Sequence, residues 1–299
     1  MAPLEIACAV LVPLLWGVQY AVIKAGLAVF PPLFFVGLRF AVVAAILLPF
    51  VGRPTRRELR VFLVISVFVG GLNFGLVFVG LAGAPASVTG IANQLWSPFA
   101  LVLAWPLLGE KPSRRAVVGV LIALAGVTLA VADPAVVVPV VPTLLVVGSA
   151  LALATGSVLT KRYGPLDPMR LMAWMSLFTV PQVLVASAVT EAGQVQALAI
   201  ADRTAWLSFA YTVLIGGIGG FGLWFWLLAR CAMARLAPFT LLQAAFAIAA
   251  GAIFRHEPLT ATLVAGAALC IGGVALSQRP APARHPRSGA PPARVPSTP

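Results

Sequence analysis

The chain has 299 residues, of which only 9% are charged and 61% are hydrophobic, and its mean hydropathy is +1.03. Soluble domains usually carry about 25% charged residues, so this composition excludes an ordinary soluble protein and places most of the chain in a lipid bilayer. The net charge of +12 does not indicate nucleic-acid binding, because the basic residues lie between apolar segments instead of forming a patch interleaved with aromatic residues.

Apolar segments long enough to cross about 30 Å of hydrocarbon follow one another along the whole chain. The first is too long for the core of a signal peptide and has no basic region before it, so we expect it in the mature protein. Breaks rich in proline and glycine separate the segments. The sequence therefore predicts ten transmembrane helices, over residues 4–27, 33–50, 61–82, 86–107, 116–132, 141–160, 171–190, 204–229, 236–254 and 259–277.

The last segment of the chain differs from the rest. Residues 279–299 are rich in proline and arginine and contain too few apolar side chains to form a core. We expect this segment to be a disordered cytoplasmic tail.

An internal repeat organises the ten helices. A shift of 147 residues brings Glu110 onto Glu257 and aligns several glycines and aromatic residues without a gap. The matched pairs include Phe74 and Phe221, Gly75 and Gly222, Phe78 and Phe225, Gly119 and Gly266, and Gly126 and Gly273. We interpret this as a duplication, with a first five-helix repeat over residues 1–134 and a second over residues 135–278.

The basic residues predict the orientation. With the N-terminus in the cytoplasm, sixteen Lys and Arg residues fall in the cytoplasmic connections and tail, and two fall in the outer connections. This positive-inside bias predicts that both termini are cytoplasmic. Because each repeat has an odd number of helices, the second must be inverted, which is a symmetry of transporters that open a central site alternately to each side.

Polar side chains inside the spans predict where this site lies. An unpaired amide in hydrocarbon costs several kcal/mol, so such side chains should face the interior of the protein. Trp16, Gln19 and Tyr20 share one face of the first helix. Together with other aromatic and amide residues they form our predicted substrate-binding set: Trp16, Gln19, Tyr20, Asn73, Phe74, Phe78, Asn93, Trp96, Ser157, Trp224, Gln243 and Phe246.

Several of these residues have a structural alternative. Trp16 and Trp96 could fill helix interfaces, and Asn93 and Gln243 could join helices by hydrogen bonds. Lys24, near the end of the first helix, could extend to the outer membrane interface or contact a substrate carboxylate.

The titratable residues argue against an enzyme. All eight acidic residues and both histidines fall at the ends of the spans or between them, and no metal-ligand cluster or activated nucleophile is visible. We therefore expect no cofactor and no bound metal. Because no acid lies near the middle of a span, we favour facilitated diffusion over proton exchange, which stays the alternative.

These features resemble the drug/metabolite transporter superfamily, EamA type. The likeness rests on Trp16-Gly17, Lys24, Pro32, Arg39, and Gly109-Glu110-Lys111-Pro112 before Gly119 and Gly126. The resemblance implies a bacterial inner-membrane exporter of small metabolites, with a cavity built mainly from helices one, three, four, six, eight and nine. The segment Asn93-Gln94-Leu95-Trp96-Ser97-Pro98 is similar to the fourth helix of exporters of aromatic amino acids in that superfamily.

The residues and the resemblance together favour export of aromatic or large hydrophobic amino acids. Drug efflux by proton exchange is one alternative, and transport of a nucleotide sugar or another solute is a second, although the spans offer only Lys24 and Arg39 as cations for such a ligand. A receptor, a scaffold or an intramembrane enzyme is less favoured. We expect the partners to be the substrate and the lipid bilayer, with no nucleic acid, and a monomer to be sufficient because one chain contains both repeats.

Overall fold

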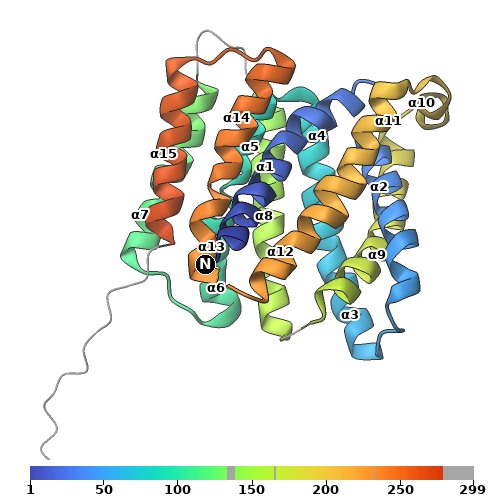
Figure 1. The fold of residues 1–299 in the computed structure, drawn as a ribbon, viewed down its shortest axis with the longest axis horizontal. Helices are drawn as coiled ribbons and strands as arrows, with labels where there is room; N and C mark the ends of the chain where they lie inside the picture. The colour runs from blue at the N-terminus through green and yellow to red at the C-terminus, as the bar shows by residue number, and fades with distance from the viewer. Residues whose placement is uncertain (133–138, 165, 232, 279–299) are drawn as a thin grey trace, which may run out of the picture.

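The computed structural model describes residues 1–132, 139–164, 166–231 and 233–278, and this part of the chain is helical, without strands (Figure 1). Nine of its helical segments are long and apolar enough to cross a membrane, and a tenth, Ala261–Ser277, has 17 residues. This confirms the predicted class, an all-α polytopic membrane protein. The tail at 279–299 and the boundary between residues 134 and 135 lie outside the described residues.

Six of the ten spans are single helices. They are α1 (Pro3–Gly26), α2 (Pro32–Leu47, extended by a 3₁₀ turn at Leu48–Phe50), α7 (Arg114–Val131), α8 (Val140–Tyr163), α9 (Pro168–Thr190) and α15 (Ala261–Ser277). The other four are interrupted: α3 and α4 (Arg56–Ile65, Gly75–Gly83), α5 and α6 (Ala86–Asn93, Trp96–Leu108), α11 and α12 (Arg203–Ala210, Gly220–Leu228), and α13 and α14 (Met233–Thr240, Leu242–Arg255). A short helix, α10 (Gln194–Ile200), precedes α11 and was not predicted.

Several helices begin earlier than their apolar stretches predict, because polar residues cap them. The third span was expected from residue 61, but α3 begins at Arg56. Thr55 accepts a hydrogen bond from the amide of Glu58, whose carboxylate accepts one from the amide of Thr55. Such a capping box satisfies amides that have no partner within the helix. Asp167 caps α9 in a similar way by accepting from the amide of Arg170.

The interruptions fall at matching places in the two halves of the chain. Ser66–Phe74 in the third span and Tyr211–Gly219 in the eighth are π-helical, and they overlap when the sequence is shifted by 147 residues. The break between α5 and α6 has a visible cause, because Pro98 lacks an amide hydrogen and its ring clashes with the carbonyl of Gln94 in a regular helix. π-helical segments often occur at functional sites.

Glycines allow α7 and α15 to pack with their backbones almost in contact. A Cβ atom added to Gly119 would lie 2.5 Å from the carbonyl oxygen of Gly273, and one added to Gly273 would lie 2.6 Å from the carbonyl oxygen of Gly119. The same reciprocity relates Gly126 and Gly266, at 2.6 and 2.7 Å. Small residues at such crossings permit close van der Waals packing in lipid, where hydrophobic burial gives little driving force.

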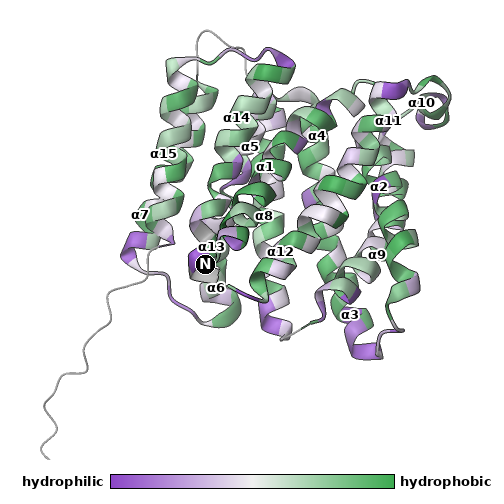
Figure 2. Ribbon diagram, in the orientation of Figure 1, coloured by the Kyte–Doolittle hydropathy of each residue, from purple (hydrophilic) through white to green (hydrophobic). Residues whose placement is uncertain are grey.

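Hydrophilic residues gather at the ends of the bundle (Figure 2). In the orientation of Figure 1, the lower end holds the N-terminus and the starts of α3 and α7, and the upper end holds α10 and the connection between α14 and α15. Figure 2 shows hydrophilic residues at the starts of α3 and α7, while the helix bodies are largely hydrophobic. Exposed apolar side chains such as Leu121, Val185 and Leu214 cover these bodies, as expected of a surface that faces lipid.

Candidate functional site

A cavity of about 300 Å³ lies in the centre of the bundle, at the lower end of the volume range usual for small-molecule sites. It lies among α1, α2, the third and fourth spans, α8, and the eighth and ninth spans. The lining residues are Trp16, Gln19, Tyr20, Ile23, Arg39, Val69, Asn73, Phe74, Val77, Phe78, Leu81, Asn93, Trp96, Leu153, Ser157, Gly216, Phe221, Trp224, Thr240 and Gln243.

The structure brings the predicted substrate-binding residues together around this cavity, with one exception. Phe246 is not among the lining residues; its Cβ atom lies beside Gly17, where α14 packs against α1. One turn of helix separates Gln243, which does line the cavity, from Phe246. The sequence predicted both residues at the substrate site, but Phe246 has its Cβ atom at the close approach of α1 and α14.

One wall of the cavity is aromatic. The ring of Trp16 lies 5.2 Å from that of Phe221 and 5.8 Å from that of Trp224, centroid to centroid, and both pairs are tilted. The indole nitrogen of Trp16 donates a hydrogen bond to the carbonyl oxygen of Gly216 at 3.0 Å. This bond fixes the orientation of the ring and satisfies a carbonyl group within the π-helical segment at Tyr211–Gly219.

Three of the predicted polar residues form hydrogen bonds with different partners. Gln243 donates to the hydroxyl oxygen of Tyr20 at 3.2 Å, so these two cavity residues also join α14 to α1. Asn73, in the π-helical segment of the third span, donates only to the carbonyl oxygen of Val69 in its own span, at 3.3 Å, and its Oδ1 atom has no partner among the described residues. Ser157 donates to the carbonyl oxygen of Leu153 at 2.7 Å.

Arg39 is the charged lining residue that our predicted substrate-binding set leaves out. It lies in the middle of α2, is 2% exposed, and presents a guanidinium group 4.4 Å from the centroid of the Phe74 ring. The sequence analysis named it as part of the family resemblance and as one of two cations within the spans, but not as a residue of the substrate site. The signal was available, because a charged residue far from both ends of a transmembrane helix usually faces a cavity and serves a function.

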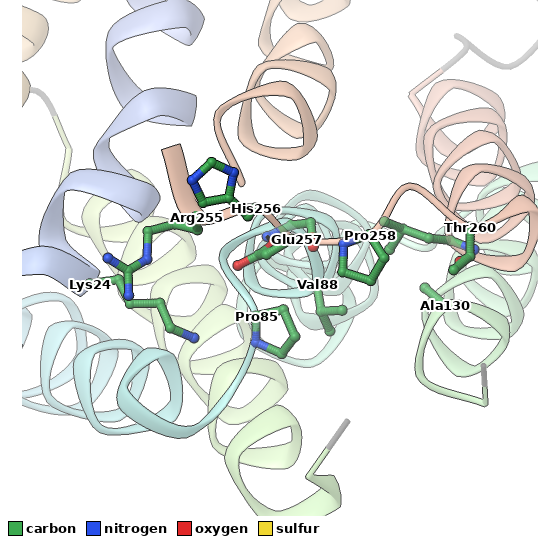
Figure 3. Close-up of a pocket in the computed structure, with 11 residues that line it drawn as sticks. Lys24, Pro85, Val88, Ala130, Arg255, His256, Glu257, Pro258 and Thr260 are labelled. Carbon is green, nitrogen blue, oxygen red and sulfur yellow. Dashed lines mark hydrogen bonds between the residues drawn. The ribbon is translucent and has the colours of Figure 1, made fainter. Parts of the chain in front are cut away.

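The upper end of the bundle holds a second, more polar pocket of about 270 Å³ (Figure 3). Here Glu257, from the connection between α14 and α15, accepts hydrogen bonds from the amides of Ala86 at 2.6 Å and Ser87 at 2.9 Å. The carboxylate thus caps α5 from another span. Lys24 donates to the carbonyl oxygen of Ala84 nearby, so it is directed toward this end of the bundle and does not line the central cavity.

A similar contact ties two further spans together at the upper end. Glu191 accepts hydrogen bonds from the amides of Leu33 at 2.7 Å and Phe34 at 3.0 Å, and therefore caps α2 from the end of α9. Two carboxylates thus hold two helix N-termini at this end. Both interactions are favourable because the amides of a first helical turn have no partner in the helix and carry partial positive charge.

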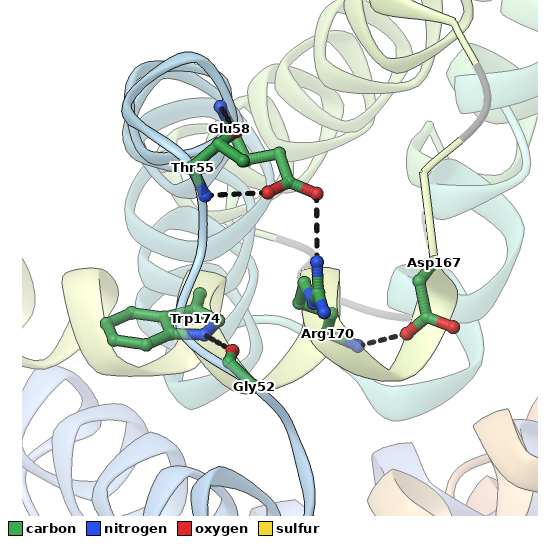
Figure 4. Close-up of polar contacts among 6 residues, drawn as sticks. All are labelled: Gly52, Thr55, Glu58, Asp167, Arg170 and Trp174. Carbon is green, nitrogen blue, oxygen red and sulfur yellow. Dashed lines mark hydrogen bonds and ion pairs between the residues drawn. The ribbon is translucent and has the colours of Figure 1, made fainter.

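The lower end is joined by side-chain pairs near its surface. Arg170 of α9 contacts Glu58 of α3 at 3.2 Å, and Trp174 donates to the carbonyl oxygen of Gly52 (Figure 4). Glu110 pairs with Lys161 at 2.8 Å, and both side chains are more than half exposed. Exposed ion pairs of this kind contribute little stability, typically below about 1 kcal/mol.

Exposure of the cavity lining increases from the upper to the lower end. Ile23, Phe78 and Leu81, toward the upper end, are buried, whereas Ser157 and Trp224, toward the lower end, are half-buried. The central cavity is therefore closed more tightly above than below.

The family follows from the sequence match. Residues 3–132 and residues 141–278 each match the EamA-like transporter family, one after the other. The chain belongs to the EamA-like transporter family. This confirms the family that the motifs resemble, and it identifies the chain as a transporter and not an enzyme.

Relatives of this EamA-like transporter include proteins named for amino-acid export. It is 30% identical to a probable amino-acid metabolite efflux pump of Salmonella typhimurium, over 89% of this chain and 92% of that protein, and equally to one of Escherichia coli. It is 29% identical to the uncharacterized transporter YvbV of Bacillus subtilis, over 88% of each chain. A solved crystal structure shares the fold, with a TM-score of 0.60 at 19% identity, over 91% of this chain and 96% of that one.

Proposed function

We propose that this EamA-like transporter exports aromatic or large hydrophobic amino acids through its central cavity by alternating access. The observation that carries the proposal is the lining: a wall of tryptophan and phenylalanine rings beside amide, hydroxyl and guanidinium groups, enclosed among seven spans. Aromatic rings favour an aromatic ligand by offset or edge-to-face stacking, beyond the area that they bury. The names of two relatives, probable amino-acid metabolite efflux pumps, support the same substrate class.

Alternating access in this fold requires two like halves in opposite orientations. Three observations support such a duplication: the two successive family matches, the π-helical segments at corresponding places, and the reciprocal glycine contacts of α7 and α15. Reciprocity is expected where a two-fold axis relates the partners, because each contact then occurs twice with the roles exchanged.

The conformation described here fits the state that is open toward the lower end. Glu257 caps α5 at the upper end, whereas Glu110, its counterpart 147 residues earlier, pairs with Lys161 at the lower surface. The helix that Glu257 caps, α5, begins at residue 86, and the same shift of 147 residues leads to residue 233, where α13 begins. In the opposite state, Glu110 would leave Lys161 and cap α13 while Glu257 releases α5.

We infer that the lower end faces the cytoplasm of a bacterial cell and that both termini lie there. The inference rests on the distribution of basic residues. The clusters at Arg53–Arg60, Lys111–Arg115 and Lys161–Arg170 belong to lower connections, whereas Arg203 and Arg255 belong to upper ones. Cytoplasmic connections carry the excess of Lys and Arg in multi-pass proteins.

Facilitated diffusion fits the placement of acidic side chains better than proton exchange does. The described carboxylates lie at helix ends or in connections, and Glu257 and Glu191 hold helix N-termini there. Proton relays through membranes use acidic or histidine side chains within the spans. Proton exchange is the second candidate, and it predicts a dependence on the pH gradient.

Counterflow in proteoliposomes tests the proposal. Vesicles are loaded with unlabelled amino acid, and uptake of the labelled form is measured for phenylalanine, tryptophan, leucine, alanine and a nucleotide sugar, with and without a proton gradient. We expect counterflow of phenylalanine, tryptophan and leucine that is independent of the gradient. Dependence on the gradient would select proton exchange, and counterflow of the nucleotide sugar alone would contradict the proposed substrate class.

A further inference from the structure

Two buried residues of the central cavity have side-chain atoms without a hydrogen-bond partner among the described residues: one residue presents donors and the other an acceptor. The Nε and Nη1 atoms of Arg39, both donors, have no hydrogen-bond partner among the described residues. The Oδ1 atom of Asn73, an acceptor, has none there either. Both residues line the cavity, and they are 2% and 4% exposed. Buried donors and acceptors are normally paired, so each of these groups calls for an explanation.

The surroundings of Arg39 leave its charge uncompensated. Neither ion pair formed among the described residues involves Arg39. The guanidinium group lies 4.4 Å from the ring centroid of Phe74 and 5.6 Å from that of Phe40, so it is held against two aromatic rings. These contacts stabilise a cation in part, but they use none of the N–H groups. A cation that is buried without a counter-ion and faces a cavity is a site for an anionic group.

The hydrogen bond of Asn73 determines which of its amide atoms is free. Nδ2 donates to the carbonyl oxygen of Val69, and the reversed amide would place two oxygen atoms against each other. The unpartnered atom is therefore the acceptor, in an irregular part of the third span next to Phe74. An acceptor at this position suits an ammonium group, which can only donate.

We propose that Arg39 and Asn73 form the polar subsite of the cavity, which binds the carboxylate and the ammonium group of an α-amino acid. This inference rests on the proposed amino-acid export and names the chemical groups that the site recognises. Arg39 donates to the carboxylate, Asn73 accepts from the ammonium group, and the side chain of the substrate lies toward Trp16 and Trp224. The subsite selects zwitterions and rejects amines without a carboxylate, because these would place a second cation beside Arg39.

Lys24 is the other cation considered for this role, and its placement argues against it. Its ammonium group donates to the carbonyl oxygen of Ala84 at the upper end of the bundle. The sequence analysis left open whether Lys24 contacts a substrate carboxylate, and our proposal assigns that role to Arg39, which lines the cavity.

Binding of three matched ligands to the purified protein tests the subsite, with the fluorescence of the cavity tryptophans as the readout. The ligands are L-phenylalanine, phenethylamine, which lacks the carboxylate, and 3-phenylpropionate, which lacks the ammonium group. We expect the wild type to bind phenethylamine roughly 10- to 100-fold more weakly than L-phenylalanine, as usual when a charged hydrogen-bonding group loses its partner. In the Arg39→Gln variant the two ligands should bind about equally.

The controls separate a binding role from a structural one. Arg203→Gln removes an exposed arginine outside the cavity and should keep the wild-type preference. Arg39→Lys retains a cation at this position and should keep part of the preference for L-phenylalanine over phenethylamine. Asn73→Leu should bring L-phenylalanine and 3-phenylpropionate to similar affinity.

The outcomes are distinguishable. If the wild type binds phenethylamine as tightly as L-phenylalanine, the subsite is wrong whether or not the variants fold. If the wild type discriminates but folded Arg39→Gln discriminates equally, another group binds the carboxylate. If the wild type binds no amino acid and shows no counterflow of one, the proposed function fails and the subsite fails with it.

Discussion

Trp96 belongs to the cavity lining and is half-buried in the fourth span. If its ring contacts the substrate side chain, Trp96→Ala removes an aromatic contact of roughly 0.5–1.5 kcal/mol. We therefore expect a roughly two- to tenfold loss of affinity for phenylalanine or tryptophan in counterflow, with the melting temperature little changed. Trp105→Ala, in the same span but 53% exposed, is the matched control and should leave flux unaltered. Unchanged flux in Trp96→Ala would remove this residue from the substrate site.

The sequence predicted individual cavity residues because lipid tolerates few alternatives. Amide and aromatic side chains within spans had to face inward, and this rule placed Trp16, Asn73 and Gln243 correctly at the cavity. The rule cannot distinguish a cavity from a helix interface, since both face inward, and Phe246 has its Cβ atom at the interface with α1. The role of these cavity residues in binding the substrate stays a prediction.

At the scale of helices, the crossing of α7 and α15 depends on glycines. A Cβ atom on Gly273 would lie 2.6 Å from the carbonyl oxygen of Gly119, whereas nothing lies within 4 Å of one on Gly272, the preceding residue of α15. Gly273→Leu should therefore destabilise the protein by about 1–3 kcal/mol or more, as overpacking does. Gly272→Leu should have little effect. The melting temperatures of the two variants in detergent measure the difference, and equal values would mean that the helices separate without cost.

The carboxylate of Glu257 should control the closure of the upper end. Glu257→Gln keeps an acceptor but loses the charge, which weakens the two bonds to the α5 amides by about 1 kcal/mol in total. We expect a cysteine replacing Val88, buried in the upper pocket, to react roughly fivefold faster with a maleimide in this variant.

Asp202→Asn is the matched control for that measurement. Asp202 caps α11 through the amide of Ala205, within its own helix, and joins no second span. Its substitution should leave the labelling rate at Val88→Cys unchanged. Equal acceleration by both substitutions would show a general loosening of the upper end, and no acceleration by Glu257→Gln would contradict its role in closure.

Helices were predictable in number and type, and Pro98 marks the break in the fourth span, but the π-helical interruptions were not predictable. Apolar length decides whether a segment crosses the bilayer, and this is visible in every span. The π-helical segments Ser66–Phe74 and Tyr211–Gly219 leave no periodic signal, because their residues are as apolar as those of a regular helix. The short helix α10 was missed because seven residues in a connection are too few for a periodic pattern.

At the scale of the whole molecule, the positive-inside rule predicts that the lower end is cytoplasmic. A cysteine replacing Arg115 should react with a membrane-impermeant reagent only after intact cells are permeabilised. A cysteine replacing Arg203, at the upper end, should react in intact cells once the outer membrane admits the reagent. The opposite pattern would invert the proposed orientation.

The sequence predicts a duplication because polar and glycine positions recur at a spacing of 147 residues. Glu110 and Glu257 share that spacing, yet the structure gives them different partners, Lys161 and the amides of α5. The equal spacing in the sequence does not show which of the two glutamates caps a helix in a given conformation, because both conformations are formed by the same residues. The difference between them therefore had to come from the structure.

The claim that the central cavity is the place where substrate binds during transport can be tested by protection from labelling. Ser157→Cys places a thiol in the half-buried lower part of the lining, and wild-type protein gives the background from its own cysteines. We predict that a soluble maleimide reacts with this thiol from the lower side and that L-phenylalanine slows the reaction, with alanine having less effect. If phenylalanine is transported and yet leaves the labelling rate of Ser157→Cys unchanged, the substrate takes another route and the account is contradicted.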